Sequence, residues 1–298
     1  MDTSSFGPFW ESDQAQPQKA LRKRQKHMAK QPRWPPTCKR FVAFLDIMGF
    51  KERMLRKRHE HVLETLKLFR KKVSPIEIEA REALSGRKQS TAEDVFGPSI
   101  VRPVFFSDSI LLVSNDDSFG AAYQIIFNVQ WILQQALRTQ VPIKGAIACG
   151  KQTADFEDSL HFGAPLIDAY ELQKQVKLYG VVLHHTMEER LAKLKVLGTD
   201  KSLMFPFGEV VKYPVPLKEG GNVNHYVVSW FDEDDAVVCF GDEGSLEPAL
   251  LKLYGTVSGS ARSYVDNTLA LARWLDERKK EEDLKASRPA LQRTKNPI

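Results

Sequence analysis

The sequence predicts an α+β fold, in which helices pack on one sheet and a flexible basic arm precedes the folded domain. Strand-like and helix-like apolar patterns follow one another in the order strand, helix, hairpin, helix, strand, helix, strand, which is typical of this class. With 298 residues, 42% hydrophobic and 27% charged, the chain has the composition of an ordinary globular protein. No apolar run approaches the roughly 20 residues needed to cross a bilayer, so we expect no membrane contact.

Positive charge is concentrated in the first part of the chain. Residues 1–40 carry nine Lys and Arg against three Asp and Glu, whereas the whole chain has a formal charge of +5. The remainder is therefore close to neutral, and we expect no specific nucleic-acid binding. We divide the chain into a flexible basic arm at 1–37, a folded domain at 38–280 and a frayed polar tail at 281–298.

The N-terminus and the cysteines indicate where the protein resides. The first residues contain neither the basic region nor the apolar region of a secretory signal. Cys38, Cys149 and Cys239 are odd in number and far apart, which argues against a disulfide framework or a zinc site. We therefore expect a cytoplasmic protein, with Cys149 as a small buried apolar residue.

The elements follow from the spacing of apolar residues. Along the first strand, 40–45, the odd-numbered apolar residues share one face, while Val42, Phe44 and Asp46 share the other. Residues 74–103 are expected to be irregular, and the pair His184 and His185, within a strand, should face opposite ways. The other expected elements are helices at 51–72, 119–138, within 161–180 and at 262–280, and strands at 101–106, 109–113, 142–149, 181–185, 224–231 and 236–240.

Two acids interrupt strands that otherwise consist of apolar residues. Asp46 ends the first strand, and Asp108 lies at the turn of the hairpin. A carboxylate in an apolar strand is costly unless a positive charge meets it, and a divalent cation could serve both acids. Mg²⁺ and Mn²⁺ prefer such oxygen ligands together with substrate phosphates. The alternative is that Asp108 caps the hairpin turn and Asp46 caps the following helix.

Three short segments resemble class III nucleotidyl cyclases in their order and approximate spacing. They are AFLDIMGF at 43–50, FFSDSILLV at 105–113 and KGAIACG at 144–150, within a resemblance that covers 40–185. Their spelling resembles most the pyrimidine cyclases of bacterial Pycsar antiphage systems. The resemblance implies a ferredoxin-like or palm-like sheet with helices packed on it, and 38–280 as the catalytic domain.

The resemblance assigns roles to residues of the first strand and the hairpin. It implies that two Mn²⁺ or Mg²⁺ ions bind Asp46 and Asp108, with the Ile47 carbonyl as a third ligand. The turn after Asp46 would offer backbone N–H groups to phosphate oxygens. For Lys144 a phosphate contact is the prediction, and a solvated side chain is the alternative. The remaining residues expected to hold the nucleotide are Phe44, Met48, Gly49 and Phe50.

The sequence departs from this family at the helix that carries its catalytic Asn and Arg. Here LIDAYEL places Ile167 at the Asn position and Glu171 at the Arg position. The replacement contacts are expected from Lys174, Lys177 or Arg102. Four residues before Asp108, where the family carries a purine-reading residue, stands Val104, which argues against ATP or GTP. Arg102, on the same strand face as Val104, could then reach a pyrimidine carbonyl.

By resemblance, the chain converts UTP, or alternatively CTP, to the 3′,5′-cyclic monophosphate and pyrophosphate. It would act as a homodimer with shared active sites, and its product would activate a separate effector protein in antiphage defence. One alternative is a nucleotide sensor without turnover, which the missing Asn and Arg favour. Another is a metal-dependent polymerase or nuclease, which the absence of a third acid directly after Asp108 disfavours.

Overall fold

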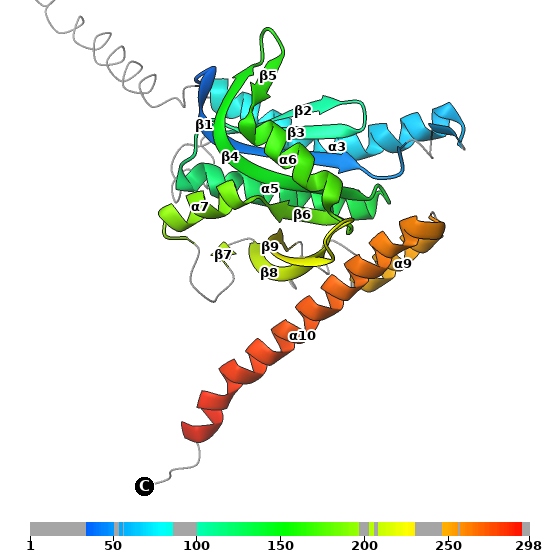
Figure 1. Ribbon diagram of the computed structural model, residues 1–298, viewed down its shortest axis with the longest axis vertical. Coiled ribbons are helices and arrows are strands. Elements are labelled where there is room, and N and C mark those ends of the chain that lie inside the picture. Colours follow the sequence, from blue (N-terminus) through cyan, green and yellow to red (C-terminus); the bar gives the residue numbers. More distant parts are fainter. Residues whose placement is uncertain are drawn as a thin grey trace, which may run out of the picture.

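The fold is α+β, with helices on both faces of a mixed sheet (Figure 1), as the sequence predicts. The computed structural model describes residues 34–50, 54–55, 57–85, 100–196, 203–205, 208–229, 246–255 and 257–293. The strands are β1 Thr37–Ile47, β2 Val101–Phe106, β3 Ser109–Ser114, β4 Ile143–Asp155, β5 Leu160–Gly163, β6 Gly180–Leu183, β7 Leu203–Phe205, β8 Gly208–Pro216 and β9 Asn222–Val228. The helices are α3 His59–Ser85, α5 Phe119–Arg138, α6 Ala164–Gln175, α7 His185–Lys193, α9 Leu246–Tyr254 and α10 Arg262–Arg293, with a short 3₁₀ turn at Gly259–Ala261.

The sheet has the order β2-β3-β1-β4-β6-β9-β8-β7, and β5 pairs with β4 beside this path. The pairing of β4 with β6 is parallel, and the other pairs are antiparallel. This order places β1 in the middle, between the β2–β3 hairpin and β4. The end of β1 that carries Asp46 therefore meets the hairpin turn on one side and the start of β4 on the other.

The two faces of the sheet carry separate apolar clusters. The odd-numbered residues of β1 from Phe41 to Ile47 pack in a cluster with residues of α3, α5, α7, α9 and α10. Val42 and Phe44 pack in a second cluster with residues of α6 and α10. The predicted alternation along β1 is thus confirmed, and it assigns Asp46 to the α6 face.

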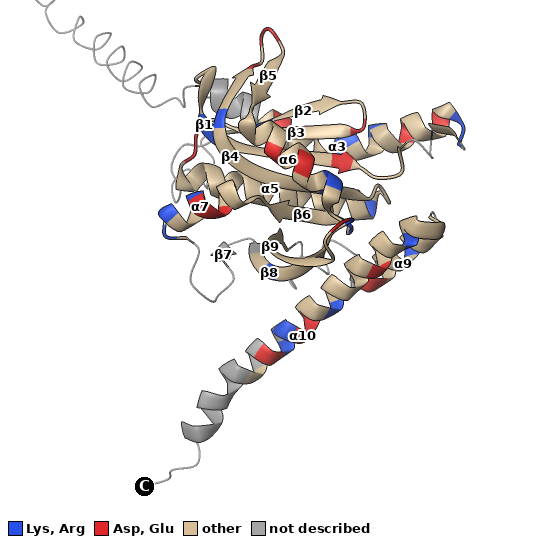
Figure 2. Ribbon diagram, in the orientation of Figure 1, with Lys and Arg blue, Asp and Glu red and all other residues tan. Residues whose placement is uncertain are grey.

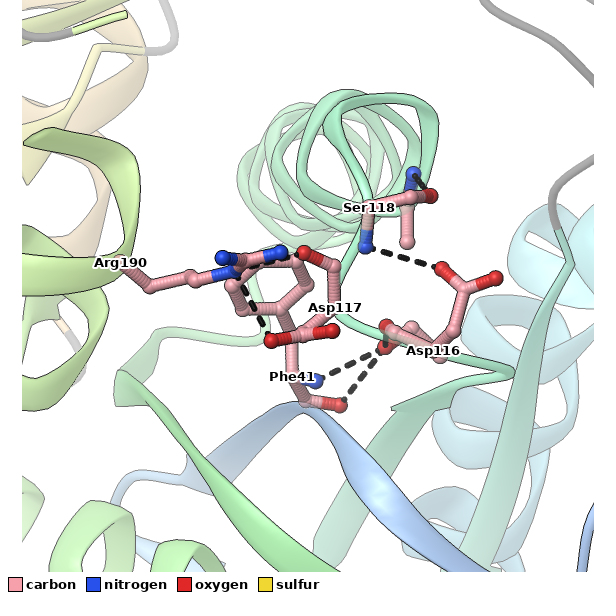
Figure 3. Close-up of polar contacts among 7 residues, drawn as sticks. Phe41, Asp116, Asp117, Ser118 and Arg190 are labelled. Atoms are coloured by element: carbon pink, nitrogen blue, oxygen red, sulfur yellow. Dashed lines mark hydrogen bonds and ion pairs between the residues drawn. The ribbon is translucent and has the colours of Figure 1, made fainter. Parts of the chain in front are cut away.

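A polar network fixes the loop between β3 and α5, at the end of the sheet opposite Asp46 (Figure 3). Ser118 caps α5 by accepting from the Ala121 amide, and the Ser118 amide donates to Asp116. Arg190 of α7 donates through Nε to the Asp117 carboxylate at 2.8 Å and to its backbone carbonyl at 2.9 Å. The helix α5 itself has the predicted bounds.

The helix predicted at 51–72 differs in continuity and length. Phe50, Met54 and Leu55 are helical and residues 51–53 and 56 lie outside the described part, whereas α3 begins separately at His59 and runs to Ser85 instead of ending at Lys72. The prediction that 74–103 is irregular is therefore wrong as far as Ser85. The buried stripe continues past Lys72 through Val73 and Ile76, so packing maintains the helix through Pro75.

Other boundaries also differ. The predicted strand 142–149 continues to Asp155, and its extension pairs with β5, which the sequence did not predict. The strand predicted at 181–185 ends at Leu183, because His184 caps α7. The rings of His184 and His185 lie 4.1 Å apart, so the prediction that they face opposite ways is wrong.

The C-terminal part of the chain differs most from the predicted topology. Strand β8 was not predicted and pairs from Val210 to Pro216 with β9, which the pattern at 224–231 only partly located. The strand expected at 236–240 and the acidic turn Asp232–Asp235 lie outside the described residues. Helix α10 continues to Arg293 rather than 280, since Glu, Lys, Leu and Ala, which form helices well, dominate the extension.

Charged residues are distributed over the whole described surface. Figure 2 shows acidic and basic residues interspersed along α3, α7 and α10, in line with the near-neutral charge of the body. Within the described part of the chain, no helix combines the length and the apolar character that a membrane crossing requires.

Candidate active site

The fold brings Asp46 and Asp108 to neighbouring positions. Asp46 pairs with Ser109 in the β1–β3 ladder, and Asp108 directly precedes Ser109 in the hairpin turn. The Ile47 amide donates to the Asp108 carbonyl at 2.8 Å, which fixes the turn against β1. Ser107 has φ 51°, a left-handed conformation that closes this tight turn.

The Asp46 carboxylate lacks full compensation of its charge. Burial raises its pKa, the ammonium of Lys144 lowers it, Asp108 raises it and Lys218 lowers it, in decreasing order of effect. Asp46 and Asp108 thus repel each other across the ladder, and no described group of three or more His, Cys, Asp or Glu forms a complete metal cage here. Two carboxylates whose remaining ligands come from substrate phosphates and water fit Mg²⁺ or Mn²⁺.

The turn after β1 directs side chains inward and leaves its backbone at the surface. Met48 and Phe50 are partly buried against the apolar cluster that contains residues of α3 and α5. The Met48 amide donates to the Pro142 carbonyl at 2.8 Å. Gly49 has φ 71° and open space where a Cβ would be. Any phosphate contact from this turn would therefore use the backbone N–H groups of Gly49 and Phe50, since that of Met48 is already bonded, and that role stays a prediction.

Lys144 lies opposite Asp46 in the β1–β4 ladder and is buried, so the alternative of a solvated side chain is wrong. Its Nζ donates to the Gln173 carbonyl at 2.8 Å and lies 3.4 Å from the carbonyl oxygens of Lys174 and Val176. Burial lowers the pKa of Lys144 to about 8, with a further lowering by Lys218 and an opposing effect of Asp46. A phosphate contact stays a prediction and would require Nζ to leave these carbonyls.

Helix α6 covers the site on the Asp46 face. Phe44 packs edge-on against Tyr170 with ring centroids 5.3 Å apart. Its side chain therefore contacts helix α6 and does not point into an open site. Lys174, a predicted catalytic residue, pairs with Glu171 at 3.0 Å. Ile167 is 62% exposed, so the family's Asn position is an apolar surface residue here.

Arg102 lies on the same face of the sheet as Asp46 but at a different level. Arg102 pairs with Val113 in β3, and Val113 pairs with Val42 in β1. Val42 precedes Asp46 by four residues, so Arg102 and Asp46 are about 13 Å apart along the strand direction. Its guanidinium carbon is 3.5 Å from the ring centroid of Phe156 and 5.5 Å from that of Trp34. Arg102 is thus separate from the Asp46 site of its own chain.

Lys218 is a neighbour of the site that sequence reasoning missed. It lies after β8, where its amide donates to the Gln175 carbonyl at 2.8 Å, and its charge acts on both Asp46 and Lys144. Leu217 forms a single bridge with Val176 at the end of α6. No sequence pattern indicated this contact, because it depends on where the β8–β9 turn meets α6.

The fold and these residues define an α+β domain in which two carboxylates lie close together at the end of β1. No protein-family model matches the sequence, and no curated protein matches it. The chain is similar in fold to the adenylyl cyclase CyaB from P. aeruginosa, with a TM-score of 0.41 and 16% identity over 66% of this chain and 98% of that chain. It is also similar to the guanylyl cyclase Cya2, with a TM-score of 0.40 and 13% identity over 66% of this chain and 94% of that chain. A third similar structure is a class III adenylyl cyclase-like ATP-binding protein from Pseudomonas aeruginosa, with a TM-score of 0.39 and 14% identity over 62% of this chain and 44% of that chain.

Cation binding should depend on pH through Asp46. Because burial and Asp108 raise its pKa, the folded state keeps the proton to a higher pH than the unfolded state, and stability without metal falls as pH rises through this window. Mn²⁺ needs the ionised carboxylate, so the increase in melting temperature that it causes should grow as pH rises and be lost on acidification. Thermal unfolding with and without Mn²⁺ between about pH 4 and 8 checks this. An increase that persists in Asp46→Asn would contradict the assignment.

Proposed function

We propose that the protein is a nucleotidyl cyclase that converts a pyrimidine nucleoside triphosphate, UTP in preference to CTP, to its 3′,5′-cyclic monophosphate. The observation that carries the proposal is the pair Asp46 and Asp108, which repel each other where the end of β1 meets the turn of the β2–β3 hairpin. Such a pair is costly for folding alone and suits the binding of a metal–triphosphate complex. The cyclic product would act on a separate effector in antiphage defence.

In the proposed reaction the ribose 3′-hydroxyl attacks the α-phosphorus, and pyrophosphate leaves. Two Mg²⁺ or Mn²⁺ ions held by Asp46, Asp108 and the Ile47 carbonyl would acidify this hydroxyl and neutralise the β,γ-phosphates. The turn after β1 would orient the triphosphate through the backbone amides of Gly49 and Phe50, because the Met48 amide already donates to Pro142. Positioning and charge stabilisation supply most of the rate, so few reactive side chains are needed.

A homodimer would complete the site. Four apolar side chains of consecutive elements are exposed, Leu160 and Phe162 on β5 and Ile167 and Tyr170 on α6. Apolar surface of this kind is typical of subunit contacts. Because Arg102 is far along the strand from the Asp46 of its own chain, a nucleotide contact of Arg102 would be made to the site of a second subunit.

The direct test is incubation of the purified protein with each nucleoside triphosphate and Mn²⁺, with products resolved by mass. Cyclic UMP or cyclic CMP would support the proposal. Binding without product would instead indicate a nucleotide sensor, which the exposed Ile167 and the Glu171–Lys174 pair favour. Extended or cleaved nucleic acid, in a parallel incubation with DNA and RNA, would indicate a polymerase or nuclease.

Arg102 should determine the choice of base. Arg102→Ala removes a charged donor, so discrimination between UTP and the other nucleotides should fall roughly tenfold or more in kcat/KM. The matched control is Phe156→Leu, which removes the stacked ring and keeps the guanidinium. Competition assays with mixed nucleotides measure both variants. An unchanged preference and rate in Arg102→Ala would remove this residue from the site.

A further inference from the structure

One buried ammonium group contacts the last turn of α6 and lies close enough to Asp46 to act on its charge. Lys144 is 3% exposed, pairs with Asp46 across the β1–β4 ladder, and donates to the backbone of the last turn of α6. The carbonyls there belong to Gln173, Lys174 and Val176. The last carbonyls of a helix lack partners within the helix and carry its negative dipole end, so a cation is favourable at this position.

Helix α6 has few other polar anchors at its last turn. Its buried residues are Pro165, Ala169 and Gln173, and its N-cap, Gly163, offers no side-chain hydrogen bond. At the C-terminal end the Lys218 amide adds one backbone bond, to the Gln175 carbonyl. The ammonium of Lys144 is therefore the main polar side-chain contact that holds the last turn of α6 on the sheet.

We propose that Lys144 is a positioning residue that couples cation binding at Asp46 to the last turn of α6. The inference rests on the proposed cation site. Without a cation, the ammonium donates to the α6 carbonyls while the Asp46 carboxylate attracts it electrostatically. A cation at Asp46 repels the ammonium and satisfies the carboxylate, so Lys144 then interacts more strongly with α6. Cation binding thus orders the turn that contains Lys174.

The signature of this coupling is a pair of opposite changes in one variant. In Lys144→Met, Mn²⁺ should bind on the order of tenfold more tightly, because a competing positive charge is gone. Turnover should nevertheless fall on the order of tenfold, because the last turn of α6 is no longer held. A residue with only a packing role would not tighten cation binding.

Hydrogen exchange of the amides at 172–176 measures the coupling itself, and titration calorimetry with Mn²⁺ alone measures affinity. In the wild-type protein Mn²⁺ should slow this exchange several-fold, and in Lys144→Met it should have no effect. Lys218→Met is the matched control. It removes a second positive charge near Asp46 but keeps the backbone bond to Gln175, so Mn²⁺ should bind more tightly and still slow the exchange.

Lys144→Arg keeps the charge and should retain both the wild-type Mn²⁺ affinity, within about twofold, and the exchange response, which separates coupling from misfolding. Wild-type protein that binds Mn²⁺ without slower exchange at 172–176 would overturn the coupling and leave the proposed function intact. An unchanged Mn²⁺ affinity in a folded Lys144→Met would do the same. Wild-type protein that does not bind Mn²⁺ would overturn the cation site itself.

Discussion

Asp46→Asn and Asp108→Asn should each reduce turnover at least about a thousandfold, which corresponds to about 4 kcal/mol of activation free energy. Each substitution removes one of the two charges that hold the proposed cations, and the side-chain volume is nearly unchanged. Product formation from UTP and CTP with Mn²⁺, measured under single-turnover conditions, checks the result.

The Asp46→Asn variant should also differ from the wild-type protein in thermal stability. Burial and Asp108 both disfavour the charged form of Asp46, so the neutral Asn should raise the melting temperature of the metal-free protein while activity is lost. The matched control is Asp266→Asn on α10, an exposed acid, which should change neither property. Wild-type turnover in a folded Asp46→Asn or Asp108→Asn would show that these carboxylates do not hold the catalytic cations.

The parts of the site that the sequence predicted correctly depend on short-range rules. Side chains alternate along a strand, so the pattern of 40–46 was sufficient to place Asp46 with Val42 and Phe44. The apolar runs around Ser107 and Asp108 located the hairpin turn for the same reason. Since β3 pairs with β1, this turn delivers Asp108 beside Asp46. The two carboxylates were thus the most predictable feature of the site.

The surroundings of the carboxylates were less predictable, because backbone groups far along the chain create them. Lys144 stands in an apolar strand, but its partners are carbonyls of a helix end about thirty residues later. A sequence pattern records side chains and does not show which carbonyls lack partners. Lys218 was missed for a related reason, since it reaches the site only through the strand β8, which was not predicted.

The predicted helix boundaries were wrong where tertiary packing outweighed local sequence signals such as proline. Among the described residues of the helix expected at 51–72, the buried stripe starts at Val62, and it continues through Val73 and Ile76. The sequence signal at Pro75 favours a break, but the apolar stripe on both sides maintains the helix. Tertiary contacts thus determined where α3 lies, and those contacts are not visible in a single sequence.

Gly145→Ala should lower the free energy of unfolding by about 3 kcal/mol and the melting temperature by roughly 8 °C. Gly145 pairs with Leu45 in the β1–β4 ladder, and an added Cβ would lie 2.5 Å from the Phe44 carbonyl oxygen and 2.5 Å from a Leu45 methyl group. The carbonyl belongs to the backbone of β1, so the strand that carries Asp46 must shift. Urea and thermal unfolding measure the loss.

Gly150→Ala in the same strand provides the comparison. Its Cβ would meet only the ring of Pro165, at 3.2 Å, so the cost should stay within about 1 kcal/mol. Because the displacement in Gly145→Ala reaches Asp46, Mn²⁺ binding should weaken in that variant and stay unchanged in Gly150→Ala. Equal stability of the two variants would mean that β1 and β4 are not in the close register that places Lys144 opposite Asp46.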